Sequence, residues 1–414
     1  MKHITKRQNN RIFNADLTKP GQNIYIDIVI LKRHMIGMFC RVFFYYNKTK
    51  KSGGAVVIKV GILTSGGDCQ GLNGAMYGLV KGLTETNKDK VEIYGILDGY
   101  TGLINGDYKK MKPEEFENIL NLGGSILGNS RQPFKKINEP DEKGRNKVEA
   151  MISNYKKMEL DCLVVLGGNG SHKTANLLSE KGLNIVTLPK TIDNDINGTD
   201  MTFGFQSAID IATRTLDELH TTAKSHGRIM IAEIMGNKAG WLTLYSGIAG
   251  KADVILIPEI PYNIEKISQY IKDKLKNGRK HIILAVAEGI ISQEETKLSK
   301  KELKQKRAKD GYISAGYRLE AELSEKIDGE VRVVVPGHIQ RGGNPCAFDR
   351  VLTSRIGVKG AELILNKQYG RMVAVQSNNI TSVPLSTAVE KPKRVDPNDE
   401  IIRQVRMLGI CLGD

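Results

Sequence analysis

The sequence predicts an α/β protein made of two similar lobes, each built on a mainly parallel sheet. Segments rich in β-branched and aliphatic residues alternate with segments of helical periodicity, which is typical of doubly wound sheets. Many of the 43 glycines follow directly on the expected strands, where open α/β sheets bind their ligands. With 414 residues, 40% hydrophobic and 26% charged, the chain is long enough to build two or three cores.

The first 57 residues differ in character from the rest. They contain eleven Lys and Arg against two Asp and Glu, a net charge of +9, so the other 357 residues carry +6 of the total +15. Their apolar runs, Ile24–Leu31 and Met35–Tyr46, fall short of the ~20 uninterrupted apolar residues that a spanning helix needs. No small-residue cleavage pattern of a signal peptide follows them. We therefore expect residues 1–57 to be a poorly ordered basic extension, and we expect no membrane partner.

A second hypothesis concerns the origin of this extension. Gly53-Gly54 would be encoded by bases that resemble a ribosome-binding sequence, just ahead of a Val57 that a GTG start codon could supply. The favoured interpretation is that residues 1–57 are not native coding sequence. An Arg-rich organelle-targeting segment is the alternative, and N-terminal sequencing of the natural protein separates the two.

The charge and the cysteines indicate which partners and which compartment suit the protein. A modest excess of +6 in the body suits small anionic substrates, and no aromatic-basic repeat supports a nucleic-acid partner. Five scattered cysteines, none spaced as CxxC, indicate a reducing compartment without a disulfide framework or zinc site. We expect a cytoplasmic protein.

The first lobe is expected to alternate strands with helices from residue 58 onward. Pro113 suits the first turn of a helix. The expected elements are a strand Val57–Leu63, a helix from Gly71, a strand Val91–Leu97, helices Lys112–Leu122 and Lys147–Lys157, a strand Asp161–Leu166, a helix around Lys173–Lys181 and a strand Leu183–Leu188.

The second lobe repeats this alternation after a long helix with apolar residues at helical spacing. We expect Ile291–Asp310 to be a solvated helix or insertion because it is strongly charged, and the tail after Ser377 to be less regular. The other expected elements are helices Phe205–His220, Leu242–Ala249, Ile264–Lys276, Ala315–Lys326 and Ala347–Leu365, and strands Arg228–Ile234, Val254–Ile257, His281–Val286 and Val331–Val335.

Two glycine-rich turns follow expected strands and are candidates for phosphate binding. They are Thr64–Asp68 and Gly167–Ser171, and each leads into a helix. Glycine lets the backbone approach phosphate oxygens closely, and a helix N-terminus favours an anion. The alternative is that each turn serves only strand–helix packing.

A third loop, Leu188–Asp200, contains the candidate catalytic carboxylates. Asp193 and Asp195 leave an expected strand end with Asn194 between them and Lys190 and Thr191 before them. One carboxylate could take a proton from a substrate hydroxyl while the other helps to hold a metal ion, as phosphoryl transfer requires. The alternative is an Asx-rich turn that caps the following helix.

Cationic side chains near strand ends complete the candidate site. Arg341 follows His338 in a glycine-flanked loop, and two cations there suit a phosphate monoester. Arg131, Arg228 and Arg332 also lie at strand or loop edges, where an arginine is often only a surface charge. Glu288 ends an apolar strand and could accept sugar hydroxyls, or it could be an ordinary solvated carboxylate.

Taken together, these motifs resemble the phosphofructokinase family, over roughly residues 58 to 374. The segments that carry the resemblance are GILTSGGDCQGLNGAMYG, GGSILGNSR, LGGNGS, PKTIDNDINGTD, SHGRIMIAEIMG, AEG and PGHIQRGGNP, in this order. The resemblance implies two Rossmann-like lobes with the active site in the cleft between them. It also implies transfer of phosphate from ATP or pyrophosphate, with Mg²⁺, to the 1-hydroxyl of fructose 6-phosphate.

The resemblance also implies roles for single residues. Asp193 would be the base on the sugar hydroxyl, Thr191 would contact the moving phosphoryl group, and Asp195 with Asn169 would support the metal ion. The donor would lie against Gly66, Gly67, Arg131, Gly168, Asn169, Gly170, Ser171 and Lys190. The sugar phosphate would be held by Thr191, Asp193, Met235, Gly236, Glu288, His338 and Arg341. Arg228 and Arg332 would reach the site of a neighbouring subunit in a homodimer or homotetramer.

The choice of donor depends on two positions. Members of the family that use pyrophosphate typically carry Asp where this chain has Gly170, which leaves space for the α-phosphate of ATP. Lys190, in contrast, stands where typical bacterial ATP enzymes carry Gly. We expect ATP, in a branch related to the pyrophosphate enzymes, and pyrophosphate is the alternative.

Departures from the family pattern leave a second class of protein as an alternative to an active enzyme. Asn169 stands where a metal-linked Asp is usual, which would suit a catalytically inactive regulatory homologue. An NAD or lipid kinase would share a GGDG-type turn but would not explain the arginines. We expect residues 58–204 with 340–390 to form the donor lobe, and residues 205–339 with 391–414 to form the fructose 6-phosphate lobe.

Overall fold

The first sheet of the molecule has seven strands in the part of the chain that the structure describes. The structure is a computed structural model that describes residues 57–85 and 90–414, so most of the predicted basic extension lies outside it. The strands follow the order β11-β10-β5-β4-β1-β2-β3. They are β1 (Ile58–Ser65), β2 (Val91–Ile96), β3 (Tyr108–Met111), β4 (Cys162–Gly167), β5 (Ile185–Pro189), β10 (Arg371–Gln376) and β11 (Asn379–Pro384).

The pairing of these strands creates a switch point between β1 and β4. Strands β10, β5, β4, β1 and β2 are parallel, while β3 and β11 pair antiparallel at the two edges. The chain continues from β1 to β2 on one side, and β4 pairs on the other side of β1. In open α/β sheets such a reversal leaves a crevice at the carboxyl ends of the two strands, and Ser65 is the register partner of Gly167 there.

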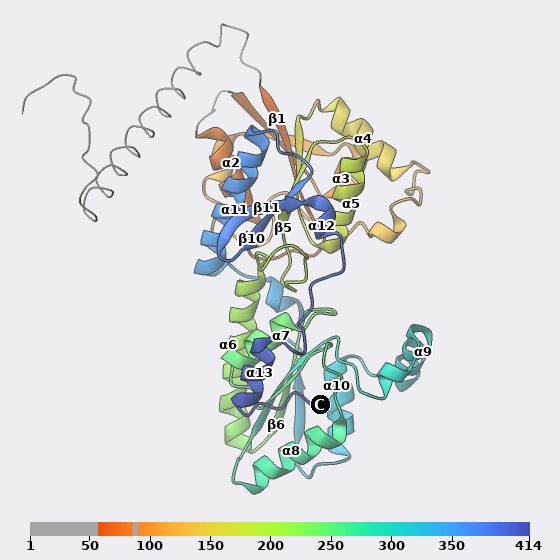
Figure 1. The fold of residues 1–414 in the computed structure, drawn as a ribbon, viewed down its shortest axis with the longest axis vertical. Coiled ribbons are helices and arrows are strands. Elements are labelled where there is room, and N and C mark those ends of the chain that lie inside the picture. The colour runs from red at the N-terminus through yellow and green to blue at the C-terminus, as the bar shows by residue number, and fades with distance from the viewer. Residues whose placement is uncertain (1–56, 86–89) are drawn as a thin grey trace, which may run out of the picture. The chain divides into compact units, whose positions relative to one another are not determined.

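Helices cover both faces of the first sheet (Figure 1). In β4, Val164 and Leu166 belong to one buried cluster, while Leu163 and Val165 belong to another. Alternate residues of a strand point to opposite faces, so the two clusters are the two sides of the sheet. One side is covered by α2 (Leu72–Thr84) and α11 (Ala347–Leu365), which contact each other. The other side is covered by α3 (Tyr100–Asn105), α4 (Lys147–Lys157), α5 (Asn169–Glu180) and α12 (Leu385–Ala388).

The second sheet has four parallel strands in the described residues, in the order β7-β8-β6-β9. They are β6 (Ile229–Ile234), β7 (Val254–Leu256), β8 (Ile282–Ala287) and β9 (Val331–Val334). Its helices are α6 (Phe205–His226), α7 (Trp241–Ala249), α8 (Ile264–Lys276), α9 (Lys300–Asp310), α10 (Ala315–Ser324) and α13 (Glu400–Met407). The α6–α7 side of this sheet shares a buried cluster with the first sheet, while α8 and α10 cover the other side.

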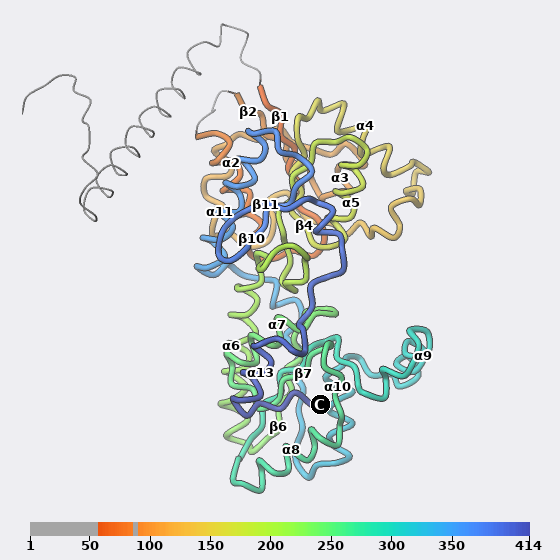
Figure 2. The backbone as a smooth tube through the Cα atoms, viewed as in Figure 1, coloured from red at the N-terminus to blue at the C-terminus, as the bar shows by residue number. Residues whose placement is uncertain are grey.

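The chain passes between the two sheets three times. It leaves the first sheet through α6, returns through α11 to form β10 and β11, and leaves again between α12 and α13. Figure 2 follows this path by colour along the backbone. The predicted fold class, two lobes with mainly parallel sheets, is therefore confirmed. Among the residues described, no helix is both long and apolar enough to cross a membrane.

Several predicted elements were wrong. The helix expected over Lys112–Leu122 is a single 3₁₀ turn, Pro113–Phe116, because Asn73 Nδ2 binds the carbonyls of Leu122 and Gly123 at 3.1 and 3.2 Å and holds the chain in a turn. The tail expected to be irregular contains β11 and α13. The predicted charged helix within Ile291–Asp310 is confirmed as α9, which has no buried residue.

Candidate active site

The two glycine turns lie side by side at the switch point of the first sheet. The first follows β1 and leads to α2, and the second follows β4 and opens α5 at Asn169. Gly66 has φ +90°, a left-handed conformation that favours glycine, and its N–H donates to Ser130 O at 3.0 Å. Both turns therefore present backbone at one edge of the sheet, as a phosphate site requires.

Gly67 lies against two guanidinium groups. A Cβ at this position would lie 2.5 Å from Arg341 Nη1 and 3.4 Å from Arg131 Nη2. Arg341 Nη1 donates to Asp68 O at 3.0 Å, which fixes the guanidinium against the turn. A methyl group at Gly67 would therefore push the guanidinium of Arg341 away from the turn.

Lys190 places a buried cation beside the same turn. It follows β5, is 2% exposed, and its ammonium donates to Gly67 O. Burial lowers the pKa of this ammonium group. The first turn is therefore surrounded by Lys190, Arg341 and Arg131.

In the carboxylate loop, which contains Asp193 and Asp195, different side chains close the turn and face the cavity. Asn194, at φ +50°, accepts through Oδ1 from Thr202 N at 3.0 Å and so closes the loop. Asp195 Oδ2 accepts from Asn169 Nδ2 at 2.6 Å. Asp193 Oδ1 is shielded from solvent and has no hydrogen-bond partner within the described residues. The Asx-turn role thus falls to Asn194, and Asp193 keeps an oxygen free for a ligand.

The electrostatics of the two carboxylates follow from their burial. Burial raises the pKa of Asp193, the nearby Arg341 and Lys190 lower it, and Glu288 raises it further. Burial, with the negative charge of Asp193, also raises the pKa of Asp195, to about 7. A carboxylate with a raised pKa is a stronger base than a free one, which suits proton transfer near neutral pH.

These groups line a cavity of about 730 Å³ between the strand ends of the two sheets. It contains most of the predicted site residues. From the first lobe these are Gly66, Gly67, Arg131, Gly168, Asn169, Gly170, Ser171, Lys190, Thr191, Asp193 and Asp195, and from the segments after β6, β8 and β9 they are Met235, Glu288, His338 and Arg341.

Two predicted residues of the second lobe support its wall through the backbone. Glu288 Oε1 accepts from Gly236 N at 3.3 Å and from Asn237 N at 2.6 Å. Met235 N donates to Gln340 Oε1 at 3.2 Å, which ties the segment after β6 to the loop of His338 and Arg341. Glu288 therefore orders the wall in addition to lining the cavity.

Arg228 and Arg332 do not line this cavity. Both side chains bind Glu330, Arg228 Nε at 2.5 Å from Glu330 Oε2. Arg332, in β9, therefore has Glu330 as its ion-pair partner. Their predicted reach into a neighbouring subunit's site stays a prediction.

Sequence reasoning missed a further part of the lining. These residues are Gln132, Pro133, Phe134, Asn237, Lys238, Ala239, Pro392 and Arg394. The first three flank a recognised motif, so proximity in sequence could have found them. Pro392 and Arg394 lie in a charged, proline-containing stretch that carries no recognisable binding pattern.

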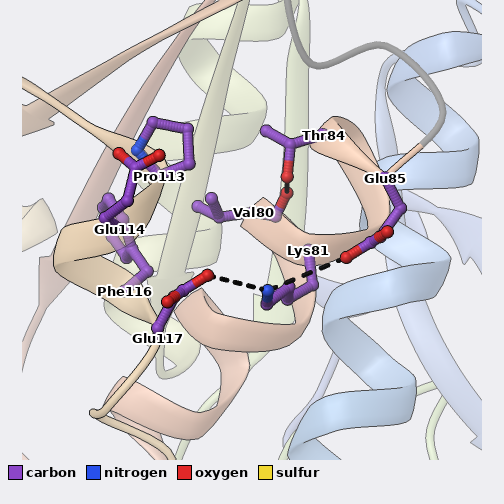
Figure 3. Close-up of a pocket in the computed structure, with 8 residues that line it drawn as sticks. All are labelled: Val80, Lys81, Thr84, Glu85, Pro113, Glu114, Phe116 and Glu117. Carbon is purple, nitrogen blue, oxygen red and sulfur yellow. Dashed lines mark hydrogen bonds and ion pairs between the residues drawn. The ribbon is translucent and has the colours of Figure 1, made fainter.

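A separate cavity of about 280 Å³ lies beside α2. Figure 3 shows Lys81 between Glu117 and Glu85, at 3.1 and 3.7 Å. It has no glycine turn and no shielded free carboxylate. The cavity of about 730 Å³ is the better candidate for function.

A metal ion could be held only together with a ligand. In the described ranges no cluster of three His, Cys, Asp or Glu could bind a metal by itself. Asp195 and Asn169, however, offer adjacent oxygen ligands at the cavity wall. Mg²⁺ is usually bound by one or two carboxylates together with substrate phosphates, so these residues fit that ion.

The fold and the site together define a two-lobed α/β protein with a cavity that is lined by glycine turns, cations and carboxylates. The sequence model of the family described as phosphofructokinase matches residues 59–364. The chain belongs to the phosphofructokinase family.

The chain is similar to curated and solved relatives over most of its length. It is 50% identical to "ATP-dependent 6-phosphofructokinase" of Spirochaeta thermophila, over 86% of this chain and 97% of that protein. It is 44% identical to "ATP-dependent 6-phosphofructokinase 3" of Bacteroides thetaiotaomicron, over 86% and 100%. The structure of phosphofructokinase from Saccharomyces cerevisiae matches with a TM-score of 0.68 and 28% identity, over 80% of this chain and 45% of that one. A pyrophosphate-dependent phosphofructokinase from Nitrosospira multiformis, 18% identical with a TM-score of 0.70 over 87% and 93%, shows the shared fold.

Proposed function

We propose that this chain is an ATP-dependent 6-phosphofructokinase. It transfers the γ-phosphoryl group of ATP to the 1-hydroxyl of fructose 6-phosphate and forms fructose 1,6-bisphosphate. The observation that carries this proposal is the shielded, unpartnered oxygen of Asp193 in a cavity lined by two glycine turns and by cations. The names of the relatives support the same activity.

The first lobe binds the donor. The backbone of Gly66 and Gly67 and the guanidinium of Arg131 contact its phosphates, while Gly168, Gly170 and Ser171 surround the rest of the nucleotide. Anions are favoured at the N-terminus of a helix, and the second turn opens α5. Lys190 adds a buried cation that strengthens this attraction.

Asp193 accepts the proton of the sugar hydroxyl as that oxygen attacks the γ-phosphorus. Its neighbour Thr191 accepts from Asp193 N at 3.0 Å, which leaves the Thr191 hydroxyl proton free for an oxygen of the moving phosphoryl group. Burial raises the pKa of Asp193, and the neighbouring Arg341 opposes this rise. General-base catalysis of this kind contributes about 100- to 10,000-fold.

Asp195 and Asn169 would hold Mg²⁺ beside the donor. The ion would neutralise charge on the donor phosphates. Asn169 keeps its Oδ1 for a cation while its Nδ2 orients Asp195. The change from a usual Asp to Asn removes a charge but keeps an oxygen ligand, which supports an active enzyme with fewer negative charges around the ion.

The second lobe holds the sugar phosphate. Arg341 and His338 face the phosphate monoester, Glu288 accepts sugar hydroxyls, and the Met235–Gly236 segment forms the wall. Arg228 and Arg332 complete this site from a neighbouring copy in a homo-oligomer. Their guanidiniums lie outside the cavity and bind Glu330 near the surface, which supports that arrangement.

ATP fits the donor side better than pyrophosphate. Apart from its chain neighbours and the backbone of its own helix, no atom of the described chain lies within 4 Å of a Cβ built on Gly170, so the space beside the second turn is open. A coupled assay with fructose 6-phosphate and each donor tests this directly. We expect ATP to be used well; activity with pyrophosphate and none with ATP would overturn the proposal.

The role of Asp193 has its own test. Asp193→Asn keeps the shape but cannot accept the proton, so kcat should fall by about 100- to 10,000-fold. The melting temperature should not fall, because the variant removes a charge that burial disfavours. An active variant, or an inactive wild type, would contradict the proposal.

The cytoplasm is the compartment that fits this proposal. The described residues include four free cysteines, Cys69, Cys162, Cys346 and Cys411. Free thiols persist in reducing compartments, where ATP and sugar phosphates are also available.

A further inference from the structure

The segment that links α12 to α13 passes beside the active site. Its residues 391–395 read KPKRV, and we call them the strap (Figure 2). Pro392 and Arg394 line the cavity that contains Asp193 and Asp195. The residue between them, Lys393, points elsewhere, and its contacts carry the inference.

Lys393 holds the carboxylate loop at three backbone atoms. Its N–H donates to Asp195 O at 2.9 Å, and its ammonium donates to Thr199 O at 2.9 Å and to Asp200 O at 2.8 Å. Hydrogen bonds from a charged donor are stronger than neutral ones. The contacts lie on both sides of the turn that follows Asp195, so they fix its position in the first lobe.

The strap is also attached to the second lobe. The Lys393 ammonium lies 5.6 Å from the ring centroid of Trp241, in the first turn of α7. Val395 N donates to Glu259 Oε1 at 3.1 Å, and Gly240 N donates to both carboxylate oxygens of Glu259 at 3.0 Å. Lys393 and Val395 therefore connect the carboxylate loop of the first lobe to the second lobe.

We infer that Lys393 is a positioning residue that sets the place of Asp195, and hence of the donor with its metal ion, relative to the second lobe. This inference rests on the proposed function. Lys393 touches no reacting atom, so it is not a catalytic residue. Its side chain acts through the ammonium, which holds Thr199 O and Asp200 O in the loop that follows Asp195. The Lys393 N–H, which a substitution leaves in place, holds Asp195 O, and Asn169 holds the Asp195 side chain.

The competing explanation is that the strap only anchors the C-terminal segment. Loss of Lys393 would then lower stability without changing how the folded protein treats its substrates. A loss of positioning has a different result, because small displacements of reacting groups lower the rate strongly. A loss of positioning should also change the kinetic constants for ATP more than those for fructose 6-phosphate.

The first test compares Lys393→Met with Lys391→Met. Both remove one charge from the strap, but Lys391 is exposed and makes no hydrogen bond or ion pair with the described chain. For Lys393→Met we expect kcat/KM for ATP to fall by about 10- to 100-fold, while the KM for fructose 6-phosphate stays within about twofold. Lys391→Met should behave like wild type, and Lys393→Arg, which can still reach carbonyls and the Trp241 ring, should recover part of the loss.

The second test uses fluorescence and does not depend on turnover. Trp241 is the single tryptophan of the chain and lies against Lys393. Addition of ATP with Mg²⁺ to wild type should shift the Trp241 emission, and the shift should be absent in Lys393→Met and present in Lys391→Met.

The two tests separate the possible failures. If Lys393→Met matches wild type in kcat/KM for ATP and in the emission shift, the inference is wrong even when its melting temperature has dropped. An equal loss on the ATP and sugar sides would also overturn it. A wild type that binds ATP with an emission shift but does not phosphorylate the sugar would instead refute the proposed function.

Discussion

The two glycine turns look alike in sequence, yet the structure surrounds them differently. At Gly67 the space that a side chain would occupy is filled by Arg341 and Arg131. At Gly170 the corresponding space is open in the described chain. Glycine allows the close approach of protein cations in the first turn, and in the proposed function it leaves room for the donor in the second.

Glycine therefore has a different role in each of the two turns. The first turn is packed against Arg341 and Arg131, and its proposed role is to bring these cations to the donor phosphates. The space beside the second turn is open, and its proposed role is to admit the donor. Substitutions at the two turns should therefore affect rate and donor choice, respectively.

Among substitutions that compare the two turns, the largest effect is expected at the packed turn. In Gly67→Ala the new methyl group would lie 2.5 Å from Arg341 Nη1, so this cation must move away from the turn. We expect kcat/KM for ATP to fall by about 100- to 1,000-fold, as when a preorganised donor is removed. Steady-state kinetics measure this loss. Gly170→Ala makes the same chemical change at the open turn and should cost at most about tenfold; equal losses would show that the two turns are equivalent.

The next effect is a change in donor choice at the open turn. Gly170→Asp fills the space with a negative charge that repels the nucleotide phosphates, so kcat/KM for ATP should fall by about 100-fold. Activity with pyrophosphate should fall much less, because that donor does not extend into the same space. Gly170→Asn, of the same size without the charge, distinguishes repulsion from steric exclusion. Equal loss with both donors in Gly170→Asp would argue against a ligand role for this space.

A smaller effect is expected from the cation that supports the packed turn. Lys190→Met keeps the volume but leaves Gly67 O without its ammonium donor. We expect kcat/KM for ATP to fall by about tenfold, in line with the loss of one charged hydrogen bond. Lys181→Met, at the exposed end of α5, is the matched control. If Lys190→Met were as active as wild type, the packed turn would not need this cation.

The smallest effect concerns the support of the second turn. His172 Nδ1 donates to Gly168 O at 2.9 Å, and its buried Nε2 has no partner in the residues that the structure covers. Burial lowers the pKa of His172 from its usual 6.5 to about 4. The unfolded chain therefore binds more protons between these values, so stability is lost as the pH falls below 6.5.

Urea unfolding at several pH values measures this loss. Between pH 7 and pH 6 we expect the His172 contribution to lower the free energy of unfolding by about 0.7 kcal/mol. His172→Gln should remove this part of the pH dependence. If wild type and variant had the same pH profile, the imidazole would not be held neutral.

Most of the fold follows from local signals in the sequence. Helices α4 and α8 have the predicted bounds, and Asn146 and Asn263 cap them through side-chain bonds to backbone N–H groups. The hairpin of β10 and β11 was missed because β10 is stabilised by pairing with β5, a strand far earlier in the chain. Such long-range pairing overrides local propensity and cannot be recognised from a short stretch of sequence.

The candidate site was predictable where its residues belong to motifs at strand ends. The sequence could not decide which of Asp193, Asn194 and Asp195 closes the loop, because all three side chains can do so. The contribution of Lys393 was not predictable either. Its partners are backbone carbonyls, which any sequence would supply, and only the fold brings them together.

The pairing of β5 with β10 also has a consequence for synthesis on the ribosome. β5 is complete at Pro189, but its second partner begins at Arg371, after all four strands of the other sheet have been made. Until then the nascent chain carries an open strand edge, which is a template for wrong pairing. The order of the strands along the chain thus delays completion of the first sheet. We expect fragments that stop before residue 371 to aggregate.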